Sequence, residues 1–222
     1  YGAETRCAPQ ELMTALRNAG ADLIQTANTH SITNGLLGLS STVSGIKNAG
    51  IQSIGTYATG ADFERSGGYL IREVDGIRIA FVAFTKGMDG RGLPKGSENC
   101  VNLLYKDYNS TYQSVDTEGI TKVLRAAAEA KPDLTVALLH WGSEYNNQIS
   151  TSQKKIVSLM AKEGVDAIIG THSHYVQSVG FDEETGIFVA YSLGDLLGDA
   201  DRTDTDYSIL LDLEITKDGD TG

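Results

Sequence analysis

The sequence predicts an α/β fold, in which helices alternate with the strands of a sheet. Two observations carry this prediction along a chain of 222 residues. Amphipathic stretches that end at glycine or proline alternate with short apolar runs rich in β-branched residues. In addition, every histidine follows such a run: His30, His140, His172 and His174. Ligands of open α/β sheets bind outside the carboxyl ends of the strands, so the second observation also predicts one shared site.

Four helices are expected from apolar periodicity combined with start and stop residues. Pro9 opens the first helix and Gly20 ends it, Pro132 ends the third, and Gly164 ends the fourth. The expected helices cover residues 10–18, 36–48, 117–130 and 152–163.

The strands are expected from the apolar runs between these helices. Asp75-Gly76 is a strong hairpin signal and joins two of them. The expected strands cover residues 23–27, 51–56, 69–74, 77–84, 134–139, 165–169, 187–192 and 207–215. Residues 86–115, rich in Gly, Asn, Ser and Tyr, are expected to form a long loop over one end of the sheet.

The composition is that of an ordinary globular protein, with 41% hydrophobic and 21% charged residues. No repeat or linker interrupts it, so a single domain over residues 1–222 is expected. The net charge of -11, without any Lys/Arg-rich stretch, argues against nucleic acid and anionic membranes as partners. A polyanionic substrate would be repelled unless the site were locally positive.

Targeting and redox signals are few. No apolar run approaches the roughly 18 residues that span a bilayer, and the chain begins at Tyr1 without an initiator Met. We therefore expect it to be part of a longer protein. Cys7 and Cys100 allow at most one disulfide, and two ordinary thiols fit equally well.

The sharpest local motif is Gly170-Thr171-His172-Ser173-His174. The glycine would allow a sharp turn after a strand, and two imidazoles two residues apart can point to one side of an extended chain. Such a pair suits metal binding. Alternatively, local hydrogen bonds in a polar loop satisfy both rings.

Three further strand ends carry groups with chemistry. Asn28 could ligate a hard cation and His30 could donate a proton, although an Asn turn is the alternative. Glu144, four residues after His140, could ligate, orient an imidazole or accept a proton, or it could be solvated beside packed Trp and Tyr side chains. Asp195 could ligate directly or hold a histidine in place, or serve only as a turn residue.

These strand ends resemble, in order and spacing, four sequence blocks of the bacterial capsule-synthesis CapA family. That family is the poly-γ-glutamate capsule group of the calcineurin-like metallophosphatase superfamily. The resemblance extends from about residue 9 to 215. The matching blocks are Ala27-Asn28-Thr29-His30, His140-Trp141-Gly142-Ser143-Glu144-Tyr145, Gly170-Thr171-His172-Ser173-His174 with Gln177 downstream, and Tyr191-Ser192-Leu193-Gly194-Asp195.

The resemblance implies a four-layer α/β/β/α sandwich of the metallo-dependent phosphatase type, with a metal site at the strand ends. It implies Asn28, His140 and His172 as ligands of a divalent metal ion (Mn, Fe, Zn or Mg), and His174 as ligand of a second ion. His30 would be the catalytic proton donor or transition-state stabiliser. Glu144 is a family-specific candidate for catalysis. Asp195 would hold a ligand histidine in place without binding the metal itself.

The chain departs from the family pattern in three places. The family begins with a strand that ends in Gly-Asp and supplies an aspartate ligand, and nothing resembling it is present here, so the sandwich is expected to lack its first strand. Asn34 stands where the family usually has Asp, and Asp195 stands where it usually has Asn. The second of these replacements would add a negative charge near the site.

Two classes of function follow. The first is a metal-dependent hydrolase-like domain of a capsule or poly-γ-glutamate biosynthesis protein, acting on a phosphoester or on an amide bond of the polymer. The second is a non-catalytic accessory subunit that binds or exports polymer. It predicts a long groove lined from residues 86–115, with Tyr105, Tyr108, Tyr112, Lys86, Lys95 and Lys106. A third, structural interpretation requires the four histidines to lie far apart.

The partners and location follow from the resemblance as well. It implies an anionic polymer or phosphoester substrate and other capsule-synthesis subunits in the membrane. It also implies an extracytoplasmic location, at the cell surface or anchored through a segment outside this chain.

Overall fold

The computed structural model describes residues 8–198 and 202–217 of the chain. The helices are α1 Glu11–Asn18, α2 Gly35–Asn48, α3 Gly60–Ser66, α4 Thr117–Glu129 and α5 Thr151–Lys162, with a 3-10 turn η1 at Glu98–Cys100. The strands are β1 Leu23–Gln25, β2 Gln52–Ile54, β3 Tyr69–Val74, β4 Ile77–Thr85, β5 Leu134–His140, β6 Ala167–Thr171, β7 Val179–Phe181 and β8 Phe188–Ala190.

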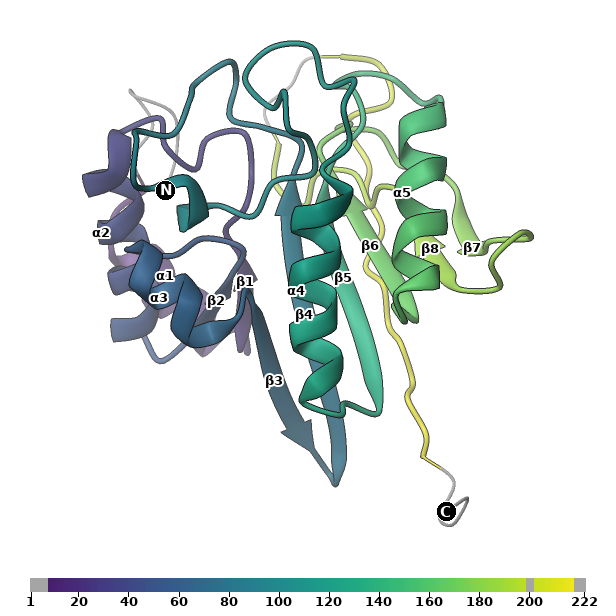
Figure 1. Cartoon of the computed structure of the whole chain (residues 1–222), viewed down its shortest axis with the longest axis horizontal. Coiled ribbons are helices and arrows are strands. Elements are labelled where there is room, and N and C mark those ends of the chain that lie inside the picture. The colour runs from purple at the N-terminus through teal and green to yellow at the C-terminus, as the bar shows by residue number, and fades with distance from the viewer. Residues whose placement is uncertain (1–7, 199–201, 218–222) are drawn as a thin grey trace.

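These elements stack as helix, sheet, sheet and helix. On one side α2 packs on the two-stranded sheet of β1 and β2, and β2 contacts β4 of the larger sheet. On the other side α4 covers β3 and β4, and α5 lies next to α4 (Figure 1). The predicted α/β class and its four-layer arrangement are therefore confirmed.

The six-stranded sheet fixes where the strand ends meet. Its order is β3-β4-β5-β6-β8-β7, in which β4, β5, β6 and β8 are parallel and the two edge strands are antiparallel to their neighbours. The register aligns Thr85 of β4 with His140 of β5, and His140 with Thr171 of β6. Three carboxyl ends thus form one row across the sheet.

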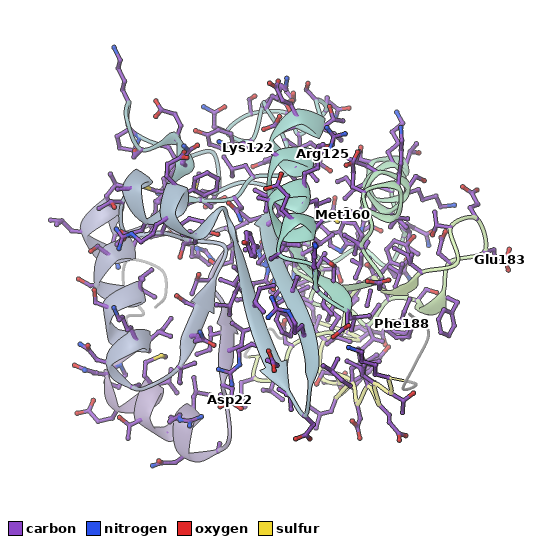
Figure 2. All side chains as sticks on the ribbon, turned by 60° about the horizontal axis from the view of Figure 1, so that its bottom comes forward. Asp22, Lys122, Arg125, Met160, Glu183 and Phe188 are labelled. Atoms are coloured by element: carbon purple, nitrogen blue, oxygen red, sulfur yellow. The ribbon has the colours of Figure 1, made fainter. Side chains whose placement is uncertain are left out.

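Helical periodicity explains how the outer helices cover this sheet. The buried residues of α4 recur three or four positions apart, as do those of α5, and they meet the apolar face of the sheet. They are Ile120, Val123, Leu124 and Ala127 in α4, and Gln153, Ile156, Val157 and Met160 in α5. Lys122 and Arg125 lie on the outer face of α4, and Glu183 lies at the tip of the turn between β7 and β8 (Figure 2).

Side-chain caps set where these two helices begin. Asp116 accepts a hydrogen bond from the backbone N–H of Gly119 at 3.1 Å, and Ser150 forms a reciprocal capping box with Gln153. Each cap satisfies N–H groups that have no partner within the helix.

Most predicted elements are present, with ends that differ by a few residues. The Asp75-Gly76 hairpin has the predicted register, and both of its turn residues have positive φ. Residues 86–115 lie over the carboxyl ends of the parallel strands, as predicted, and contain only η1 as regular structure (Figure 1).

The predicted strand over residues 207–215 is wrong, and β7 was not predicted. In the described part of the chain, residues 207–215 have no strand partner, and the backbone hydrogen bond at this segment joins Ile209 N–H to Leu193 O at 2.9 Å. Alternation of apolar residues shows that one side of a segment faces the protein. A strand also requires the edge of a neighbouring strand for its backbone hydrogen bonds. β7 is only three residues long, too short for periodicity to show.

Gly170 has a different role from the predicted turn. It lies inside β6, and a Cβ there would overlap the carbonyl oxygen of Tyr191 and the indole nitrogen of Trp141. That nitrogen donates to Tyr191 O at 2.9 Å, and the two rings stack 5.6 Å apart. The glycine is needed for close approach between β6 and the segment after β8.

We predict that Gly170→Ala lowers the free energy of unfolding by about 3 kcal/mol, because the added methyl must displace backbone and break a buried hydrogen bond. Urea unfolding measures the loss. Gly60→Ala at the start of α3 is the matched control, since a Cβ there meets nothing within 4 Å. Equal stability of the two variants would contradict the close-approach role.

Candidate functional site

The centre of the candidate site is a pair of imidazoles from adjacent strands. His140 ends β5 and His172 follows the last residue of β6, and their ring centroids are 4.4 Å apart. His140 Nε2 lies 3.4 Å from the Thr29 hydroxyl and Nδ1 lies 3.2 Å from the Thr171 hydroxyl. The sequence predicted both histidines as site residues but did not predict a role for these hydroxyls. The available signal was that Thr29 and Thr171 each directly precede a histidine.

Both rings are held in the neutral form. Burial lowers the pKa of His140 well below its usual value, and the neighbouring titratable groups of His172 and Lys86 lower it further. Burial also lowers the pKa of His172 to about 3, with the charge of Lys86 as the next cause. A neutral imidazole has the free lone pair that metal ligation requires.

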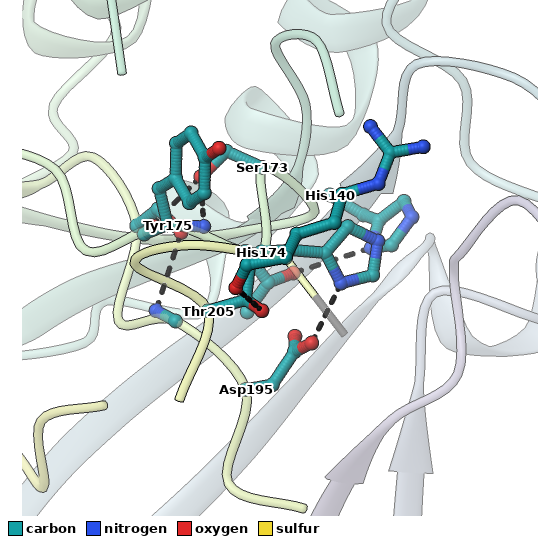
Figure 3. A network of polar contacts seen from close by, with 10 residues as sticks. His140, Ser173, His174, Tyr175, Asp195 and Thr205 are labelled. Carbon is teal, nitrogen blue, oxygen red and sulfur yellow. Dashed lines mark hydrogen bonds and ion pairs between the residues drawn. The ribbon is translucent and has the colours of Figure 1, made fainter. Parts of the chain in front are cut away.

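His174 belongs to a second, adjoining arrangement. Its Nδ1 lies 2.6 Å from Asp195 Oδ2 (Figure 3). Its ring stacks on the Tyr145 ring, with the two ring centroids 4.8 Å apart. Arg202 covers the Tyr145 ring at 3.7 Å. The carboxylate fixes one ring nitrogen of His174 and leaves Nε2 for another partner.

The predicted extended geometry of His172 and His174 is wrong. Both residues have positive φ, 103° for His172 and 63° for His174, so the chain turns between them. His172 therefore joins His140, whereas His174 joins Asp195. Two hydrogen bonds hold this turn: the Tyr145 backbone N–H donates to Ser173 O, and the Gln177 side-chain Nε2 donates to Asn146 O.

Asn28 and His30 lie at the mouth of the site in a local turn. Asn28 Oδ1 accepts from the His30 backbone N–H at 2.8 Å, and Asn28 Nδ2 donates to Thr26 O at 3.2 Å. This is the Asn turn named as the alternative for Asn28, although the amide oxygen keeps a second lone pair. His30 is exposed, and it is close enough for its charge to lower the pKa of His140 and His172.

Glu144 is exposed on the loop after β5, and its charge acts on Lys86. Lys86 follows β4, donates from its backbone to His140 O at 2.8 Å, and donates from Nζ to Gly142 O at 2.8 Å. Burial lowers the pKa of the Lys86 ammonium, while Glu144 opposes that shift.

The tyrosine-lined groove predicted from residues 86–115 is not formed by these side chains. Tyr105 is buried and meets Tyr112 edge to face at 6.0 Å, and Tyr108 OH accepts from Leu93 N–H. Tyr105 therefore belongs to the main core beside the large sheet, and Tyr108 and Tyr112 pack against that core. Lys95 and Lys106 are exposed. Lys86 alone of the six predicted groove residues reaches the histidines.

A cavity of about 620 Å³ lies between the site and the elements α1, β1 and α2. His30, Asn28, His140 and Thr171 line one end, and apolar residues of α1, β1 and α2 line much of the rest, among them Met13, Ile24, Leu39 and Ile46. Among the described residues β1 pairs only with β2, so the second edge of β1 has no strand partner.

The four histidines lie in one region, which contradicts the interpretation that they are scattered. Within residues 8–198 and 202–217, however, no three His, Cys, Asp or Glu side chains are grouped closely enough to hold a metal ion. The described donors therefore offer two neutral imidazoles but do not by themselves fit a metal. Cys7 lies outside the described residues, and Cys100 is buried with a free thiol.

The described helices include none that is long and apolar enough to cross a membrane.

Comparisons with known proteins agree with the sequence blocks. The family described as bacterial capsule synthesis protein PGA_cap matches residues 3–200. The capsule biosynthesis protein CapA of Bacillus anthracis is 28% identical over 96% of the chain, and the PGA biosynthesis protein CapA of Bacillus subtilis is 26% identical over 95%. The chain spans 48% and 51% of these two relatives, about half their length.

Among solved structures, a protein of Staphylococcus aureus described as a 5'-nucleotidase, in complex with alpha-ketoglutarate, has a TM-score of 0.53 at 13% identity. The match covers 81% of this chain and 34% of that one. The calcineurin-like phosphoesterase YfkN of Bacillus subtilis has a TM-score of 0.46 at 19% identity, over 78% and 50% of the two chains. The first likeness supports the fold only.

We predict that the metal-free protein loses stability as the pH falls below about 6.5. The unfolded chain binds a proton at His172 near pH 6.5, whereas the folded chain binds it only near pH 3. Between these values the unfolded state holds more protons, so acid favours unfolding. His172 alone should contribute about 2 kcal/mol of loss between pH 7.5 and pH 5.

Urea unfolding at both pH values, in chelator, measures this effect. His172→Gln is the matched variant, because it removes the titrating group and should reduce the pH-dependent loss by about that amount. If His172→Gln and the unchanged protein lose the same stability, His172 does not titrate as the structure indicates.

Proposed function

The chain belongs to the bacterial capsule synthesis family PGA_cap, and from its site we propose that it is the hydrolase-like metal-binding part of a capsule biosynthesis protein. We propose that it acts on a phosphoester or on an amide bond of a poly-γ-glutamate-type polymer. The supporting observation is the pair of neutral imidazoles at adjacent strand ends, 4.4 Å apart. Two neighbouring neutral imidazoles can supply two of the ligands of a divalent metal ion.

The missing donors would come from a segment outside the described residues. Support for this comes from the open edge of β1 and from the cavity that reaches His140. An extended segment beside β1 would end near the imidazoles, where a carboxylate could complete the set with Asn28. With its ligands complete, a divalent ion would supply Lewis acidity.

The chain's own residues would have distinct tasks. Burial would keep His140 and His172 neutral, and the hydroxyls of Thr29 and Thr171 would orient the His140 ring. Asp195 would orient His174 through Nδ1. His30, exposed at the mouth, would carry a proton to a leaving group, and Glu144, an exposed carboxylate whose charge acts on Lys86, would meet an approaching substrate.

The second candidate function is a non-catalytic subunit that binds or passes polymer. One observation favours it: among the described residues no group of three metal-binding side chains exists. In that case the histidines would be a binding surface only. For either function we also propose an extracytoplasmic location and membrane-bound capsule-synthesis partners, as the resemblance to the family implies.

We predict that a version extended by native upstream sequence holds close to stoichiometric divalent metal, while the present chain holds it at least about tenfold more weakly. The reason is that two neutral imidazoles lack an anionic donor. Elemental analysis after dialysis measures the content of both forms.

His172→Ala in the extended form tests whether the metal binds at the histidine pair. Lys47→Ala, at an exposed position in α2, is its control. Metal content should fall in the first variant and persist in the second. Absence of metal from both the chain and the extended form would remove the basis of the hydrolase and favour the polymer-binding subunit.

We predict that His30→Ala in the metal-loaded form lowers kcat about 100-fold or more, because the leaving group loses its proton donor. Hydrolysis of an aryl phosphoester and of a γ-linked glutamate oligomer would be followed, with affinity measured separately. Affinity should stay close to that of the unchanged protein. An unaltered kcat on every hydrolysed substrate would remove His30 from catalysis.

A further inference from the structure

Lys86 lies at the end of the strand beside His140, on the side away from His172. The register aligns Thr85 with His140 and His140 with Thr171, so Lys86 and His172 each come one residue after this row. The Lys86 backbone N–H donates to His140 O at 2.8 Å, and the charge of its ammonium acts on both His140 and His172.

The surroundings hold this ammonium in place without neutralising it. Nζ donates to Gly142 O at 2.8 Å and lies 4.6 Å from the centroid of the Tyr112 ring. Gly87 allows the loop to close here, because a Cβ at that position would overlap Tyr108 O and press on Tyr112. A carbonyl and an aromatic face orient a cation, but neither carries a full negative charge.

Lys86 lacks an anionic partner within the described part of the chain. Of the ion pairs formed by the described residues none includes Lys86, and Glu144 acts on it only at longer range. One of its three N–H groups is used by Gly142, so two remain for a ligand. A half-buried ammonium without a counter-ion is costly, and an incoming anion would relieve that cost.

We propose that Lys86 binds an oxyanion of the substrate, a carboxylate or a phosphate, next to the bond that the histidine site acts on. This inference rests on the proposed function, since it takes the histidine pair as the place where substrate is received. It defines the substrate class as one with a negative group adjacent to the reacting bond. It also explains how a chain with a net charge of -11 could accept an anion.

The test is binding, which does not require turnover. Calorimetry or NMR titration would measure three probes on the full chain: inorganic phosphate, a γ-linked glutamate oligomer, and the same oligomer with its side carboxylates converted to amides. Lys86→Met should weaken binding of at least one anionic probe by about tenfold or more. The amide oligomer should bind Lys86→Met and the unchanged protein alike.

Two variants separate charge from structure. Lys86→Arg keeps the positive charge and should retain most of the affinity. Lys106→Met removes a charge from the same loop, at an exposed position that pairs with Glu118, and should change nothing. Loss of the phosphate response alone would identify a phosphoester as the source of the oxyanion, and loss of the oligomer response alone would identify a polymer carboxylate.

The proposal is overturned if Lys86→Met binds both anions like the unchanged protein, or if it weakens the amide oligomer equally. It is also overturned if neither anion binds the unchanged protein. Failure of the proposed hydrolase would instead show as absent metal or absent turnover while the Lys86-dependent binding persists, so the two failures are distinguishable.

Discussion

The site depends on one constraint, the parallel register of β4, β5 and β6. That register places Thr85, His140 and Thr171 at equivalent positions. Because side chains alternate along a strand, a slip of one residue would send the His140 side chain to the opposite face of the sheet. The buried residues of both faces oppose such a slip, since Leu139 and Val136 would lose their places in the core. Burial of the sheet therefore determines the geometry of the imidazole pair.

Close approach between two backbone segments fixes the turn that follows β6. Gly170 lets β6 lie against Tyr191, and the indole of Trp141 joins the two. The turn that follows holds His172 and His174 at positive φ, a conformation that costs free energy for such residues. It persists because hydrogen bonds from Tyr145 and Gln177 hold both sides of the turn. Sheet packing thus supports a strained loop that turns one histidine toward β5 and the other toward Asp195.

The sequence was sufficient to predict the strand ends, because buried strands and their flanking helices leave strong periodic signals. It also predicted that histidines from three separate blocks meet in one region. It could not predict that His172 and His174 diverge, since that depends on φ angles set by tertiary contacts. Nor could it assign residues 207–215, whose alternation suits a strand but whose described neighbours offer no strand edge. The orientation of Lys86 depends on a loop closure that Gly87 allows, and no periodicity reports that closure.

The charge of Lys86 links the two proposed ligands of the site, a divalent cation and an anionic substrate. The described residues bring together two neutral imidazoles and one ammonium, and no carboxylate forms an ion pair with that ammonium. A divalent cation entering this environment would be repelled by Lys86, so it needs a negatively charged donor as well as the imidazoles. An oxyanion bound at Lys86 would reduce the same repulsion. A carboxylate donor and an anionic substrate should therefore each strengthen metal binding, because each brings negative charge close to the Lys86 ammonium.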